Sequence, residues 1–168
     1  MKKNNIILTR IDNRLVHGQV GMTWGHILNI NTLVVVDNTT AASPFAQKLM
    51  QSVASAANLR IEFYTINEFV HSKEMFNESK RIFLIVPSLH IAKQIMDGGV
   101  TLEKINVGNV HYERNRVAFN HKVYLSKDDI DIVNFMLDQN TYLYFQDVPG
   151  STIEKFTKLD YESMKKRR

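Results

Sequence analysis

Short apolar runs alternate along the chain with segments whose apolar residues recur every three or four positions. The runs predict strands at residues 6–8, 33–36, 61–66, 82–86, 105–107 and 142–145, with one or two more between 117 and 125. Most of these runs are apolar throughout, which is typical of strands that are covered on both faces.

The recurring segments predict amphipathic helices. Ser43, Ser88 and Ser126 are suited to cap the helices that follow them, and Asn67 is suited to cap a short one. Two inner faces are expected: one on the helix over residues 19–28, with Val20, Trp24, Ile27 and Leu28, and one on the helix after Ser43, with Phe45, Ala46, Leu49, Met50 and Val53.

The alternation of strands and helices indicates an α/β fold with a mainly parallel sheet of about six or seven strands. We expect a single domain over residues 1–168, with a solvated basic tail at about 152–168. Ligands of such folds bind at the carboxyl ends of the strands, and His17, in the first strand-to-helix connection, falls at that edge.

The first connection gathers charged side chains around one histidine. A guanidinium group, as in Arg10 and Arg14, can bind two oxygens of an oxyanion at once, and neutral imidazole is a nitrogen nucleophile. Together these residues predict that His17 accepts a phosphoryl group. Asp12 would repel that group, so it is expected to orient His17 or to hold an arginine.

Two backbone features of the loop suit the same chemistry. Gly18 lets the backbone approach a bound anion, and the helix that begins near Gln19 offers unpaired N–H groups at its positive end. We therefore expect Arg10, Gly18 and Gln19 to bind phosphate. The alternative is an ordinary loop histidine beside a surface ion pair, worth at most ~1 kcal/mol.

Composition excludes several kinds of chemistry. The sequence has no cysteine, which rules out disulfides, thiolate nucleophiles and cysteine-based zinc sites. His71, His90 and His121 have no partner at metal-ligand spacing, so we expect no metal, and we expect no cofactor either. The net charge of +4 comes from six basic residues at the chain ends. The rest of the chain has 15 basic and 17 acidic residues and is slightly acidic, which disfavours nucleic-acid binding. Without a membrane span or signal peptide in the sequence, we expect a cytoplasmic protein.

Residues 10–20, Arg-Ile-Asp-Asn-Arg-Leu-Val-His-Gly-Gln-Val, carry a resemblance to a known family. They are similar to the active loop of the IIB component of the mannose/fructose/sorbose class of the bacterial phosphoenolpyruvate-dependent sugar phosphotransferase system. Residues 33–37, 106–108 and 146–150 also resemble this family, and the resemblance covers roughly residues 5–150. It implies a three-layer α/β/α sandwich.

The resemblance implies a function as well. Such a component takes a phosphoryl group from a phosphohistidine of the IIA component and holds it on its own histidine. It then passes the group to a sugar that arrives through the membrane components IIC and IID. His17 matches that histidine, and Arg14 and Asp12 match the charged residues of its loop. The implied protein is a cytoplasmic phosphotransferase, peripherally associated with its transporter, whose intermediate is a covalent phosphohistidine.

The segment 107–112, Val-Gly-Asn-Val-His-Tyr, bears on the sugar. It looks like the Gly-Asn-Met-His segment of the N-acetylgalactosamine/galactosamine branch, with Val110 in place of the methionine. In this family the membrane components bind the sugar, so the likeness concerns partners first. It implies N-acetylgalactosamine or galactosamine as the sugar.

Four more residues are expected at the edge of the site: Asp37, Asn38, Ser88 and His111. The first three could equally be turn or cap residues, and His111 follows the Gly-Asn segment. Two other functions are alternatives to phosphoryl transfer for such a chain. A nucleotide-binding enzyme would need a G-x-G-x-x-G turn or a Walker lysine, and the sequence has neither. A non-catalytic regulatory module could sense small anions through the same loop without being phosphorylated.

Overall fold

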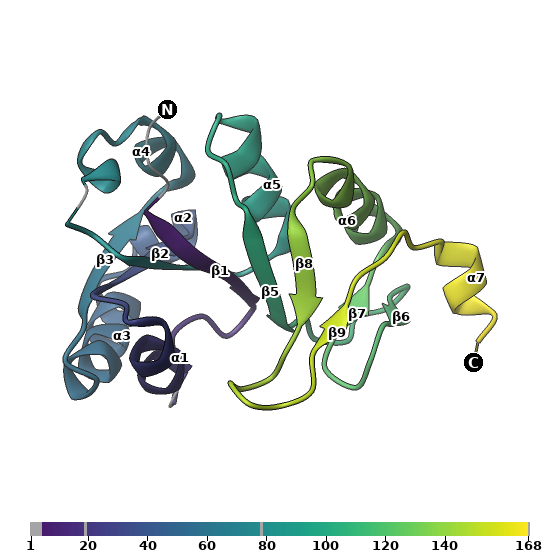
Figure 1. The fold of residues 1–168 in the computed structure, drawn as a ribbon, viewed down its shortest axis with the longest axis horizontal. Coiled ribbons are helices and arrows are strands. Elements are labelled where there is room, and N and C mark those ends of the chain that lie inside the picture. Colours follow the sequence, from purple (N-terminus) through teal and green to yellow (C-terminus); the bar gives the residue numbers. More distant parts are fainter. Residues whose placement is uncertain (1–4, 19, 78, 168) are drawn as a thin grey trace.

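The computed structural model describes residues 5–18, 20–77 and 79–167, with the backbone alone at 20–22. A seven-stranded sheet crosses it in the order β3-β2-β4-β1-β5-β8-β9 (Figure 1). All neighbouring strands are parallel except β8 and β9, which confirms the mainly parallel sheet. The strands are β1 (Ile6–Asp12), β2 (Thr32–Val36), β3 (Arg60–Tyr64), β4 (Ile82–Val86), β5 (Lys104–Asn109), β8 (Tyr142–Phe145) and β9 (Glu154–Lys155).

Helices cover both faces of this sheet, which confirms the α/β/α sandwich. One face packs against α1 and α3, and the other packs against α4, α5 and α6. The helices are α1 (Val20–Leu28), α2 (Asn38–Ala41), α3 (Pro44–Ala56), α4 (Ile66–His71), α5 (Leu89–Asp97), α6 (Lys127–Asp138) and α7 (Tyr161–Lys165), with a 3-10 turn, η1 (Glu74–Phe76). A small antiparallel hairpin, β6 (Val117–Ala118) and β7 (Tyr124–Leu125), lies beyond the β8 side of the sheet (Figure 1).

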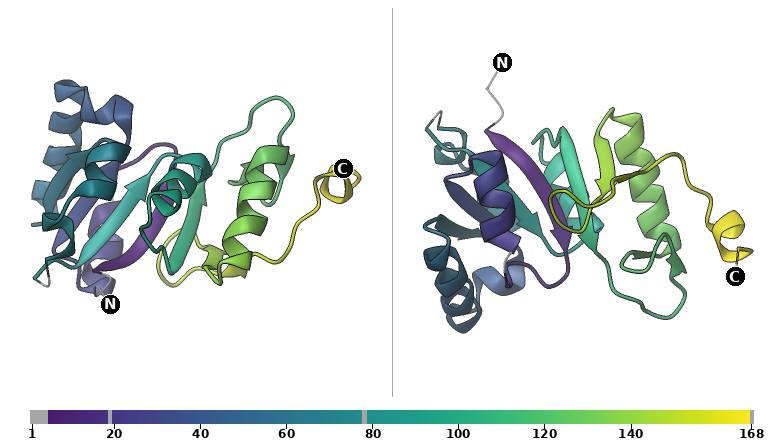
Figure 2. Two further views of the ribbon diagram at one scale, coloured as in Figure 1. Left: turned by 90° about the horizontal axis from the view of Figure 1, so that it is seen from above. Right: turned by 60° about the horizontal axis from the view of Figure 1, so that its bottom comes forward.

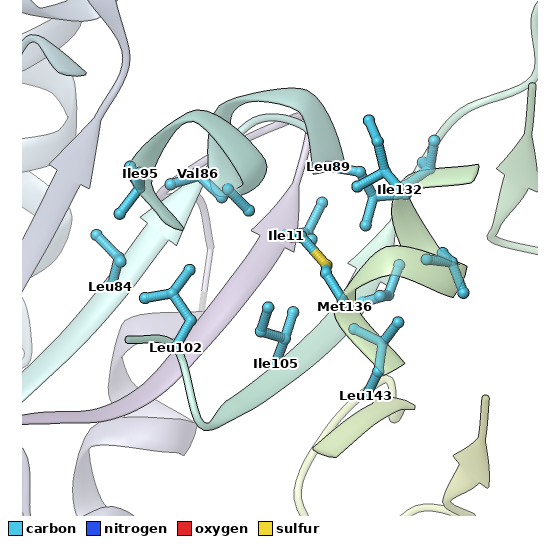
Figure 3. Close-up of a cluster of buried hydrophobic side chains, with 14 of the residues drawn as sticks. Ile11, Leu84, Val86, Leu89, Ile95, Leu102, Ile105, Ile132, Met136 and Leu143 are labelled. Atoms are coloured by element: carbon cyan, nitrogen blue, oxygen red, sulfur yellow. The ribbon is translucent and has the colours of Figure 1, made fainter. Parts of the chain in front are cut away.

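Two hydrophobic clusters hold the layers together. Side chains of β2 alternate between them, since Leu33 and Val35 face α1 and α3 while Val34 and Val36 face the opposite layer. In the cluster on the side of α4, α5 and α6, Met136 of α6 projects onto the sheet next to the β1 strand (Figure 3). Full burial of one such side chain stabilises the fold by roughly 1.5–3 kcal/mol.

The helix starts follow local side-chain chemistry. Ser43, Ser88 and Ser126 each accept a backbone N–H of the following helix, which confirms all three predicted caps. The prediction for Asn67 is wrong. Thr65 caps α4 instead, because Thr65 and Glu68 form a reciprocal capping box that leaves Asn67 inside the first turn.

Three side chains that were expected on inner faces are exposed. Phe45 and Leu49 of α3 are 75% and 57% exposed, because α3 packs through Met50, Val53 and Ala54, on its other side. Ile27 of α1 is 65% exposed, although Trp24 and Leu28 do pack inward. The predicted apolar stripes were therefore too wide. The side chain of Val20 lies outside the described residues.

The first strand is longer than its apolar run. It was expected at residues 6–8 but extends to Asp12, so that Arg10 and Asp12 belong to the strand and not to the loop. The reason is its central place in the sheet. Backbone pairing continues to Ile11 on the β4 side and to Asp12 on the β5 side, and the two charged side chains neutralise each other.

The C-terminal segment is more than a solvated tail. Its strand β9 pairs with β8, and Phe156 is buried with its ring stacked 4.0 Å from that of Phe119. Both views in Figure 2 place α7 outside the main body at this end of the sheet. Lys165 and Lys166 are exposed, as predicted. Among the described helices, none has the length and apolar character that crossing a bilayer requires.

Candidate active site at the carboxyl end of β1

The period of the β-strand places Arg10 and Asp12 on the same face of β1, and both side chains are buried. Arg10 Nη2 donates to Asp12 Oδ2 at 3.3 Å, and Nη1 donates to Asn106 Oδ1 and to the Gln146 carbonyl at 3.2 Å. The Trp24 ring lies 5.8 Å from Arg10 Cζ. Burial lowers the pKa of Arg10, and the negative charge of Asp12 opposes that shift.

The Asp12 carboxylate also fixes Arg14. Its Oδ1 accepts the Arg14 backbone N–H at 3.0 Å and Nε at 3.3 Å, while Oδ2 accepts Nη2 at 3.4 Å. Half of the Arg14 side chain is nevertheless exposed. Of the two roles expected for Asp12, these contacts favour holding the arginines. No contact between Asp12 and His17 occurs among the described hydrogen bonds.

His17 is held by a strained loop. Leu15 has φ +56°, in the left-handed region that a leucine adopts at a cost of about 1–2 kcal/mol. Its N–H donates to the Asp12 carbonyl at 2.9 Å, and the side chains of Leu15 and Val16 are buried in the hydrophobic cluster that contains Trp24. His17 itself is half-buried, and its Nδ1–H donates to the Leu15 carbonyl at 2.8 Å.

This hydrogen bond distinguishes the two ring nitrogens of His17. A carbonyl oxygen only accepts, so Nδ1 carries the proton in this orientation and Nε2 holds the free lone pair. Attack through Nε2 preserves the bond to the Leu15 carbonyl. Attack through Nδ1 requires the ring to turn away from it.

A pocket of about 260 Å³ opens beside His17. It is lined by Arg10, Arg14, His17, Thr23, Trp24, Lys122, Asp147 and Val148. The structure thus brings His17 and the two predicted arginines to one cavity. It adds Lys122 and Asp147, whose Nζ and Oδ2 atoms lie 2.6 Å apart. The hydrogen bond from Lys122 lowers the pKa of Asp147.

The sequence prediction missed this ion pair. Asp147 lies within residues 146–150, a segment that resembles the family and could have drawn attention to it. Lys122 has no comparable local signal, because its place in the pocket depends on how the β6–β7 hairpin packs against the sheet.

The backbone elements expected to bind phosphate are described in part. Gly18 is exposed with φ +48°, a conformation that favours glycine, and nothing lies within 4 Å of where its Cβ would be. Helix α1 begins at Val20, two residues later. Gln19 lies outside the described residues, so its expected role stays a prediction.

Three of the four expected edge residues bond to backbone N–H groups at helix starts. Asp37 caps α2 by accepting the Thr40 N–H, Asn38 Oδ1 accepts the Ile66 N–H, and Ser88 caps α5. The pocket lining does not include them. Their contacts agree with the alternative reading as turn and cap residues.

His111 lies closer to the loop. Its Nδ1 is hydrogen-bonded to the Asn13 side-chain amide, and the Asn109 amide is bonded to the oxygen of the same Asn13 side chain. His111 Nε2 also lies 2.9 Å from a Glu113 carboxylate oxygen. The Gly-Asn segment therefore contacts the loop that carries His17, although His111 is not part of the pocket lining.

Within residues 5–18, 20–77 and 79–167, no three histidine or carboxylate side chains are grouped as a metal site. The cavity instead presents two guanidinium groups, one ammonium group and an imidazole, together with the carboxylate of Asp147. Cationic N–H donors around a nitrogen nucleophile suit an oxyanion that is transferred to the imidazole.

Comparisons with known proteins agree with this chemistry. A family model described as "PTS system sorbose subfamily IIB component" matches residues 6–168, which includes the tail left out of the resemblance. The chain is 37% identical over 155 residues to the N-acetylgalactosamine-specific phosphotransferase enzyme IIB component 1 of Escherichia coli K12, covering 92% of this chain and 98% of that protein.

Solved structures agree as well. The crystal structure of the N-acetylgalactosamine-specific IIB component 1 from Escherichia coli is similar with a TM-score of 0.87 at 37% identity, covering 90% of this chain and 99% of that one. A PTS-dependent N-acetyl-galactosamine IIB component from Streptococcus pyogenes has a TM-score of 0.82 at 30% identity, covering 90% and 93%.

Proposed function

Since the chain belongs to the sorbose subfamily of IIB components of the sugar phosphotransferase system, we propose that His17 is the residue on which it carries a phosphoryl group. Family membership makes the protein a phosphotransferase that acts as a phosphoryl carrier in sugar uptake, and it disfavours the anion-sensing module. The observation that supports His17 is its place in a cationic pocket at the carboxyl end of β1.

The transfer needs two imidazoles in line across one phosphorus atom. The lone pair of the unprotonated ring nitrogen of His17 forms the new N–P bond. The electron pair of the old N–P bond returns to the donor imidazole, so no proton has to move. The protein contributes position and charge stabilisation.

The two arginines have different parts in this step. Arg14 is half-exposed, and its guanidinium group is oriented by Asp12 before the phosphoryl group arrives. We assign Arg14 to the equatorial oxygens. Arg10 is 1% exposed and is held by three acceptors. We assign Arg10 mainly to positioning Asp12 and to the positive potential of the pocket.

IIB components work with IIA and with membrane IIC and IID components. We propose that this chain takes its phosphoryl group from the phosphohistidine of its own IIA and gives it to N-acetylgalactosamine or galactosamine. Two observations support the sugar: the specificity named for two relatives, and the likeness of residues 107–112 to the segment of the N-acetylgalactosamine/galactosamine branch.

Sugar phosphorylation by a reconstituted transporter tests this proposal. Membranes that contain the cognate IIC and IID would be combined with phosphoenolpyruvate, the general phosphotransferase proteins, IIA and the purified chain. N-acetylgalactosamine or galactosamine should be phosphorylated in preference to mannose, and His17→Gln should abolish the reaction. A preference for mannose would reject the sugar assignment, and full activity of His17→Gln would reject the phosphorylated residue.

A further inference from the structure

The pocket beside His17 contains an ion pair that the mechanism above does not use. Lys122 Nζ and Asp147 Oδ2 lie 2.6 Å apart, and both residues line the cavity together with His17 and Arg14. About a third of each side chain is exposed, so both can be reached from the cavity.

The backbone of Lys122 is fixed on both sides. Its N–H donates to Asn120 Oδ1 at 2.9 Å, and its carbonyl accepts the Val110 N–H at 3.0 Å. The neighbouring His121 ring contacts the ring of Phe145 at the end of β8. A fixed backbone leaves the flexible butyl chain of Lys122 to change partners.

The two carboxylates near the cavity differ in burial and in their partners. The carboxylate of Asp12 is fully buried and binds both Arg10 and Arg14. The carboxylate of Asp147 is partly exposed and faces the cavity with Lys122 as its partner. A phosphoryl group on His17 would bring negative charge into this cavity, attract the ammonium group of Lys122 and repel Asp147.

We propose that Lys122 is a phosphate-binding residue that exchanges Asp147 for the phosphoryl oxygens on His17, and that Asp147 limits how tightly the group is held. The proposal rests on the proposed function of His17. Lys122 stays protonated throughout and donates N–H bonds, so the electron pairs move as in the transfer described above.

A competing carboxylate suits a carrier. The site has to accept a phosphoryl group and later give it up, and a stronger grip on the phosphorylated form would slow the second step. Lys122 has Asp147 as a partner in the unloaded site. Breaking that ion pair costs free energy, so the net gain from binding the phosphoryl oxygens is smaller. The ion pair thereby adjusts the equilibrium between the donor and His17.

The test measures phosphoryl exchange between phospho-IIA and the full chain in two variants. Lys122→Gln should accept the group at least ~10-fold more slowly and hold a ~10-fold smaller equilibrium share of it, since one charge-assisted bond is lost. Asp147→Asn should shift the equilibrium ~10-fold in the opposite direction and slow the onward transfer. Lys122→Arg should retain most of the wild-type equilibrium.

The chain offers a matched control on α5. Lys93 and Asp97 form an exposed pair with Nζ and Oδ2 2.7 Å apart, and neither lines the pocket. Lys93→Gln and Asp97→Asn should leave the exchange unchanged. Shifts of the same sign in Lys122→Gln and Asp147→Asn would overturn the inference, because they would indicate a merely structural pair.

Equilibria of both variants within twofold of the wild type would also overturn it. If Lys122→Gln folds poorly, the direction in which Asp147→Asn shifts the phosphoryl equilibrium still tests the inference independently. Failure of the wild type to accept any phosphoryl group would reject the proposed function itself, and is thereby distinguished from failure of this inference alone.

Discussion

Gly108 of β5 lies directly against the guanidinium group of Arg10 on the neighbouring strand. A Cβ atom at position 108 would come within 2.2 Å of Arg10 Cζ and 2.3 Å of Nη2. The glycine is therefore required by close approach, and it creates the space in which Arg10 binds Asp12. The Asn-Val-Gly segment that resembles the family, residues 106–108, thus leaves room for Arg10 on β1, the strand that leads to His17.

Gly108→Ala should displace Arg10 and destabilise the fold by about 2–3 kcal/mol, because a side chain must be forced out of a packed interior. Denaturant unfolding measures the loss, and phosphoryl acceptance should fall with it. Gly25→Ala is the control, since its Cβ would meet the flexible end of Leu59 at 3.0 Å. Equal stability of Gly108→Ala and the wild type would contradict the close approach.

Asp12→Asn should cost about 3–5 kcal/mol of unfolding free energy, because the buried charge of Arg10 loses the carboxylate that it binds. Asp97→Asn, in the exposed pair, should change stability by less than about 1 kcal/mol. Combining Asp12→Asn with Arg10→Met should cost less than the sum of the single changes. Additive costs would show that the two side chains do not depend on each other.

Arg14→Lys should fold normally but take up the phosphoryl group at least ~10-fold more slowly, because an ammonium group cannot reproduce the two-point grip of a guanidinium group. Its half-exposed side chain makes a large loss of stability unexpected. Rapid-quench measurement of transfer from phospho-IIA checks the rate. A rate equal to that of the wild type would remove Arg14 from the mechanism.

The pH dependence of stability should report on Tyr144. Burial raises the pKa of Tyr144 to about 12, so the folded state favours the neutral phenol. Its contribution is fully present below the ordinary pKa of about 10 and is lost as the pH rises through about 12.

Tyr144→Phe should therefore lose about 1–2 kcal/mol less unfolding free energy than the wild type between pH 10 and 12. The exposed Tyr112 gives the control Tyr112→Phe, which should follow the wild-type curve. Identical losses in Tyr144→Phe and the wild type would show that the buried phenol does not oppose ionisation.

Local signals in the sequence predicted the elements that local interactions determine. The apolar run at residues 82–86 is β4, and the serines at 43, 88 and 126 are N-caps because each bonds within its own helix. Residues 154–155 gave no such signal. A two-residue strand depends on pairing with β8, so its position follows from the completed sheet.

The site shows the same division. The spacing of charged residues at the end of β1 and in the connection after it was sufficient to single out Asp12, Arg14 and His17. The burial of Arg10 could not be foreseen, because it depends on Gly108 and Asn106 from another strand. Lys122 is more than one hundred residues from His17 in the chain and enters the pocket through the packing of a hairpin.

The central claim is that His17 holds the phosphoryl group, and locating that group on the wild-type protein tests it most directly. The chain would be phosphorylated with phosphoenolpyruvate, the general phosphotransferase proteins and IIA, digested at alkaline pH and mapped by mass spectrometry. We predict one acid-labile, base-stable phosphoryl group on the imidazole of His17. An acid-stable group, or a phosphoryl group on any other residue, would contradict the account.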